Sequence, residues 1–173
     1  MIKRVFAILT LGVFLVLFNQ SCTVSLNGAS IPAELKTINV GYFENNAQLV
    51  VGNLSQDFTE ALKSRIRSTT RLSITQGEAD ASLTGNITSY TIEPVSVQAT
   101  TSNNVAPIAS ANRLTITVNV TYTNKANKKF NFSQSFPAFA DFTGDVATQE
   151  QGLIATITKQ LTEDIFNRAF ANW

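Results

Sequence analysis

Alternating apolar and polar residues predict β-strands along much of the chain. The pattern is clearest between Arg113 and Thr123, where every second residue is apolar: Leu114, Ile116, Val118, Val120 and Tyr122. A period of two sends these side chains to one face of a sheet and the intervening threonine and asparagine residues to the other. The same reasoning predicts a hairpin turn after this strand and an antiparallel strand over residues 130–136. Pro137 should end that strand, because proline cannot donate a ladder hydrogen bond.

Three further strands are predicted nearer the N-terminus. They fall within residues 35–43, 71–75 and 81–92. In the last of these the phase of the alternation changes at Thr88 or Ser89, which indicates a β-bulge there.

Two segments instead repeat their apolar residues at intervals of three and four, which predicts amphipathic helices. The first covers residues 54–69, and Asn53 with Gln56 resembles a capping box at its start. The second covers residues 148–172. Their apolar stripes consist of Leu54, Phe58, Ala61, Leu62 and Ile66 in the first and Ile154, Ile157, Leu161, Ile165 and Ala169 in the second. Each stripe needs a sheet or another helix to cover it.

The order of strand, helix, meander of strands and helix predicts the fold class. We expect an α+β domain, with a mostly antiparallel sheet of four to five strands and two helices packed on one face. Residues 35–173 should form this single domain, since a chain of this length buries a sizeable core in one unit.

The N-terminal region predicts export and lipid attachment. Residues 1–21 read as a signal peptide, with Lys3 and Arg4 before an apolar run too short to span a bilayer. Cys22 follows it as the only cysteine of the chain, so it cannot form an intramolecular disulfide. Its position resembles the lipobox of bacterial lipoproteins, although Asn19 stands where leucine is usual. We expect Cys22 to carry lipid and residues 22–34 to be a tether.

The destination follows from resemblance to lipoprotein sorting signals. Thr23 replaces the aspartate that retains lipoproteins at the inner membrane, and no acidic run follows Cys22. We therefore expect a protein anchored by lipid in the outer membrane, on the periplasmic side.

The amino-acid composition excludes several kinds of catalytic and metal site. The chain has no histidine, which excludes Ser–His–Asp and Cys–His nucleophiles. With Cys22 lipidated, the composition also excludes every zinc site built on histidine or cysteine. Neighbouring carboxylates such as Glu163 and Asp164 diverge on a helix and make no acid–base pair. Charge is nearly balanced, with 13 basic and 12 acidic residues, so nucleic acid is not an expected partner. We expect no enzyme, no cofactor and no metal.

Several segments in order resemble the LptE family of lipopolysaccharide-assembly lipoproteins. They are SLNGASIP at 25–32, KTINVGYFEN at 36–45, DFTEALKSRI at 57–66, ADASLTGNITSY at 79–90 and LTEDIFN at 161–167, followed by Trp173. The resemblance implies an α+β protein that binds an LptD-like outer-membrane β-barrel and supports lipopolysaccharide transport and outer-membrane assembly, with direct lipopolysaccharide contact as a further option. The alternative is an envelope scaffold lipoprotein that binds another protein or a glycan.

Two groups of residues are candidates for these contacts. Lys125, Lys128 and Lys129 lie at the predicted hairpin tip, where they either keep the turn soluble or meet the phosphates of lipopolysaccharide. Phe139 and Phe142 lie beyond Pro137 and either fold over the core or form an interface with the barrel. We expect Phe139 on the core and Phe142 at the interface.

Overall fold

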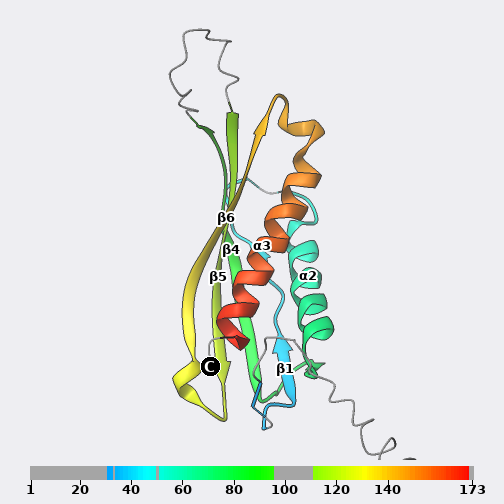
Figure 1. The fold of residues 1–173 in the computed structure, drawn as a ribbon, viewed down its shortest axis with the longest axis vertical. Coiled ribbons are helices and arrows are strands. Elements are labelled where there is room, and N and C mark those ends of the chain that lie inside the picture. The colour runs from blue at the N-terminus through cyan, green and yellow to red at the C-terminus, as the bar shows by residue number, and fades with distance from the viewer. Residues whose placement is uncertain (1–30, 33, 50, 96–110, 172–173) are drawn as a thin grey trace, which may run out of the picture.

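The computed structural model describes residues 31–32, 34–49, 51–95 and 111–171. The expected signal peptide, Cys22, most of the tether and Trp173 lie outside these residues. The elements are β1 Thr37–Val40, β2 Glu44–Asn45, α2 Leu54–Thr69, β3 Ser73–Thr75, β4 Ala81–Val95, β5 Ala111–Asn124, η1 Lys128–Phe130, β6 Phe132–Thr143, η2 Val146–Thr148 and α3 Glu150–Phe170. The α+β class is confirmed, with both helices on one side of a long, twisted sheet (Figure 1).

The sheet itself differs from the prediction, because it is mixed and has six strands. Its order is β3-β1-β4-β5-β6, and β2 also pairs with β4. β1 is parallel to both β3 and β4, while β4, β5 and β6 are antiparallel. The physical reason is the connection through α2, since a helical crossover returns the chain parallel to the strand it left. The expectation of a mostly antiparallel sheet of four to five strands is therefore wrong for the N-terminal part.

The first predicted strand is divided at Gly41. Ile38 is fully buried on β1, but Tyr42 is exposed and Phe43 is buried, which reverses the expected phase. The backbone N–H of Gly41 donates to the Leu83 carbonyl at 2.9 Å, so the chain stays beside β4 through the change. β2 then forms directly after the predicted strand, at Glu44–Asn45.

β4 and β5 form a long hairpin in agreement with the sequence pattern. The register shifts between Ile87 and Ser89, at the predicted bulge. Every apolar residue of the alternating set in β5 is at most 1% exposed. β6, however, continues through Pro137 to Thr143, so the expectation that Pro137 ends the pairing is wrong. β6 is the outer strand of the sheet, and an edge strand accommodates proline when the ring nitrogen faces away from its neighbour.

Both helices form where the apolar stripes predict them and bury those stripes against the sheet. The core contains Phe58, Leu62 and Ile66 from α2 and Ile157, Leu161 and Phe170 from α3. The predicted capping box does not form, since Asn53 has a left-handed backbone (φ 69°) and its side chain makes no capping hydrogen bond. Among the described helices, none combines the length and apolar character that crossing a membrane requires.

Asp80 joins the start of β1 to the start of β4. Its carboxylate accepts hydrogen bonds from the Thr37 hydroxyl at 2.8 Å and from the backbone N–H groups of Lys36 and Thr37 at 3.0 and 2.9 Å. These bonds, led by the Thr37 hydroxyl, lower the pKa of Asp80 from its ordinary value of 3.8. The ionised carboxylate is thus the form that the fold stabilises.

We therefore expect acid to remove the contribution of Asp80 to stability. A depressed folded pKa gives stabilisation that is complete above the unfolded pKa and is lost as the pH falls through the folded pKa. Asp80→Ala should lower the denaturant midpoint at about pH 6, and its difference from wild type should shrink at about pH 3. Glu78→Ala, an exposed carboxylate in the same turn, is the control and should change the midpoint little. A difference between wild type and Asp80→Ala that persists unchanged in acid would contradict this role.

Candidate interaction surfaces

The sheet face turned away from the helices is polar over much of its area. On β5 the side chains of Thr115, Thr117, Asn119, Thr121 and Thr123 point to this face, and all are half-buried or exposed. Ser133 and Ser135 on β6 lie opposite Thr121 and Asn119, and both cross-strand pairs are hydrogen-bonded. The face offers rows of hydroxyl and amide groups that can exchange hydrogen bonds with water or with another polar surface.

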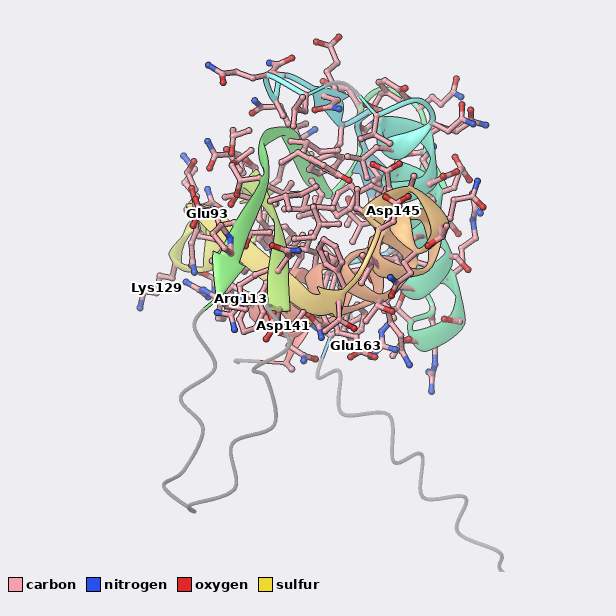
Figure 2. The ribbon with its side chains drawn as sticks, turned by 90° about the horizontal axis from the view of Figure 1, so that it is seen from above. Glu93, Arg113, Lys129, Asp141, Asp145 and Glu163 are labelled. Carbon is pink, nitrogen blue, oxygen red and sulfur yellow. The ribbon has the colours of Figure 1, made fainter. Side chains whose placement is uncertain are left out.

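Three charged residues lie side by side across one end of this face (Figure 2). Glu93, Arg113 and Asp141 are register partners on β4, β5 and β6. Arg113 donates two hydrogen bonds to Asp141, from Nε to Oδ1 at 2.7 Å and from Nη2 to Oδ2 at 2.9 Å. This guanidinium lowers the pKa of the Asp141 carboxyl. The sequence pattern misses the pair for two reasons: we end the strand at Pro137, and the register across the hairpin, with Tyr122 opposite Phe132, depends on the shape of the turn.

The two candidate phenylalanines lie on opposite faces of β6. The Phe139 ring is 48% exposed and lies under the Arg113 guanidinium, with Cζ 3.8 Å from its centroid. The Phe142 ring is only 6% exposed and belongs to the core. This placement is the reverse of our expectation, because continuation of β6 keeps Phe142 in phase with the inward Phe136. Phe139 is thus the ring accessible to a partner.

The hairpin tip between β5 and β6 is held by asparagine side chains. The Asn124 Oδ1 atom accepts from the backbone N–H groups of Ala126 and Asn127, and Asn127 Oδ1 accepts from Lys129. Lys125, Lys128 and Lys129 are all exposed at this tip. Lys125 lies near Asp80, and within the described part of the chain none of the three forms an ion pair. A turn fixed by asparagines thus presents three ammonium groups to solvent.

A tyrosine–carboxylate contact connects the sheet to α3. The Tyr90 hydroxyl donates to Glu150 Oε1 at 2.7 Å. Burial raises the pKa of Tyr90, and the Glu150 carboxylate raises it further, so the phenol keeps its proton. The residues are 60 apart in sequence, and no local pattern could have paired them. In the described ranges, no three His, Cys, Asp or Glu side chains cluster in a way that could hold a metal ion.

Comparison with solved structures finds proteins of similar fold. It matches the crystal structure of a minor lipoprotein from Acinetobacter baumannii with a TM-score of 0.50 at 14% identity, over 78% of this chain and 91% of that one. The rare lipoprotein B structure from Shewanella oneidensis gives a TM-score of 0.46 at 11% identity, over 76% of this chain and 92% of that one. A sequence search of curated proteins finds no significant match.

The family profile of LptE, described as lipopolysaccharide-assembly, matches residues 35–169. The match covers nearly all of the predicted domain, and the chain belongs to the LptE family. The family resemblance noted from the sequence segments is therefore confirmed. Membership in this family supports a role as an envelope lipoprotein of lipopolysaccharide assembly, and the family is a non-enzymatic one.

Proposed function

We propose that this protein supports lipopolysaccharide transport by binding an LptD-like β-barrel through the polar face of β4, β5 and β6. The observation that carries the proposal is the position of this face, which lies opposite the two helices and consists largely of hydroxyl and amide groups. Large outer-membrane barrels enclose polar, watery interiors, which such a face complements. Phe139 adds an exposed aromatic ring at one end, the kind of residue that often anchors an interface.

The anchor of this arrangement is lipid on Cys22, which places the domain on the periplasmic side of the outer membrane. The cysteine follows directly on the apolar leader. A stable anchor needs more than one acyl chain, because a single chain binds a membrane only marginally. Mass spectrometry of the mature N-terminus should find an acylated cysteine.

The hairpin tip is the proposed contact for lipopolysaccharide. Lys125, Lys128 and Lys129 are exposed on a turn whose backbone is already ordered, so only the entropy of their side chains is lost when they meet phosphate groups. Glutamine at all three positions keeps side-chain length and removes the charge. This variant should retain the barrel and bind less lipopolysaccharide.

Native co-purification tests the barrel partnership. The wild-type chain, extracted with mild detergent, should bring down a large heat-modifiable β-barrel, and Phe139→Ser should recover clearly less of it. Thr101→Ser serves as a conservative control for expression and handling, and should recover as much barrel as wild type. If native extraction repeatedly yields no barrel, the protein is better explained as an envelope scaffold that binds another protein or a glycan.

A further inference from the structure

A long groove separates α2 and α3. The helices run parallel, since Leu54 and Ile154 line one end of the groove while Arg65 contacts Glu163 and Phe166 at the other. The groove has a volume of about 910 Å³, and no strand residue of the described ranges lines it. It extends along α2 from Leu54 to Ser68, about 21 Å at the rise of an α-helix. It is therefore separate from the polar sheet face.

Two residues that line this groove have a buried polar atom without a hydrogen-bond partner. Thr158 is 6% exposed, and its Oγ1 atom makes no hydrogen bond. The Nε atom of Arg65 is also buried and unbonded, and its ion pair with Glu163 is long, at 3.5 Å from Nη1. Both side chains line the groove. Buried polar groups usually have partners, so two unsatisfied donors in one groove indicate an acceptor supplied from outside.

The groove also has an uneven charge. Asp57 and Glu150 lie at the end formed by the two helix N-termini, whereas Arg65, Lys159 and Glu163 lie further along, so the first end is negative and the rest of the groove carries a net positive charge. Small side chains occur along both walls of the groove and would admit a closely approaching backbone; they are Ala61, Ser64, Ser68 and Ala155. The dipoles of two parallel helices repel each other, and an antiparallel helix beside them offsets that repulsion.

We propose that the groove binds an amphipathic helix of a partner protein, antiparallel to α2 and α3, with acidic residues in its first turn and basic residues in its last. An acidic side chain near its N-terminus accepts hydrogen bonds from Arg65 Nε and Thr158 Oγ1. Its basic C-terminal turn meets Asp57 and Glu150. The groove length accommodates about four helical turns. This inference goes beyond the barrel partnership and does not depend on it.

Two synthetic peptides test the charge arrangement. Both have about 16 residues, a leucine–alanine face and a hydrocarbon staple that keeps them helical. One has glutamates in the first turn and lysines in the last, and the other has the same composition with these charges exchanged. Binding is measured to the full chain in detergent by fluorescence anisotropy. The first peptide should bind about tenfold more tightly. Equal affinities, or no binding by the first peptide, would overturn the proposal.

Variants of the protein test the location. Ala155→Arg places a long side chain in the groove and should abolish binding of the first peptide. Gln160→Arg adds the same charge on an exposed position of α3 outside the groove, and should leave affinity unchanged. Thr158→Val should weaken binding several-fold without lowering stability, since it removes only an unbonded hydroxyl. Unaltered binding by Ala155→Arg would overturn the proposal, whatever the barrel experiment finds.

Discussion

Gly85→Ala is expected to destabilise the domain by about 3 kcal/mol or more, the upper range for an overpacked core. Gly85 lies in the middle of β4, opposite Val120. A Cβ atom there would lie 1.9 Å from the Asn119 carbonyl oxygen and 2.7 Å from Phe43 Cε1. The first contact is with backbone, so side-chain rotation cannot relieve it. The β4–β5 hairpin must therefore separate at this point, and the buried Phe43 ring must move as well.

The loss of stability is measured on a soluble form that lacks residues 1–24. Its unfolding by denaturant is followed by circular dichroism. Gly152→Ala is the matched control, because no atom lies within 4 Å of its added Cβ and the position is inside α3. Alanine is the better helix former by about 0.5–1 kcal/mol, so this control should be slightly stabilised. If Gly85→Ala unfolds at the wild-type midpoint, the close approach of β5 and Phe43 to Gly85 is wrong.

Phe142→Ser should cost about 3–5 kcal/mol, as truncation of a buried phenylalanine does. Phe142 is 6% exposed in the core, whereas Phe139 is 48% exposed on the opposite face of the same strand. Phe139→Ser should therefore change stability by only about 0.5–1 kcal/mol, mainly through loss of its contact with Arg113. The same substitution at two positions three residues apart thus distinguishes a side chain that stabilises the fold from one that is available to bind a partner.

The two variants are compared by denaturant midpoint and by recovery of the barrel. Phe139→Ser should lower the denaturant midpoint only slightly and recover less of the barrel, which identifies a contact surface. Phe142→Ser should unfold early, and any loss of barrel then follows from loss of fold. Similar midpoints for the two variants would mean that β6 does not continue through Pro137 as the structure has it.

Local patterns in the sequence determine the elements and their inward faces. The period of three to four residues in α2 and the alternation in β5 predict which side chains are buried, and the structure agrees. The phase change before Ser89 likewise marks the bulge, because an added residue exchanges the two faces of a strand. Together with the family segments, these patterns were enough for the α+β class and for LptE membership.

Tertiary structure alone decides how these elements meet. Alternation predicts which face of a strand a side chain lies on, but it does not predict which strands are neighbours or in which direction they run. The parallel pairing of β1 with β3 and β4 could therefore not be predicted from it. Whether proline ends a strand depends on its position in the sheet, and Pro137 is tolerated because β6 is at the edge. That single fact places Phe142 inside, Phe139 outside and Asp141 beside Arg113. The groove and the Tyr90–Glu150 contact arise between residues distant in sequence, where only the packing of helix on sheet brings them together.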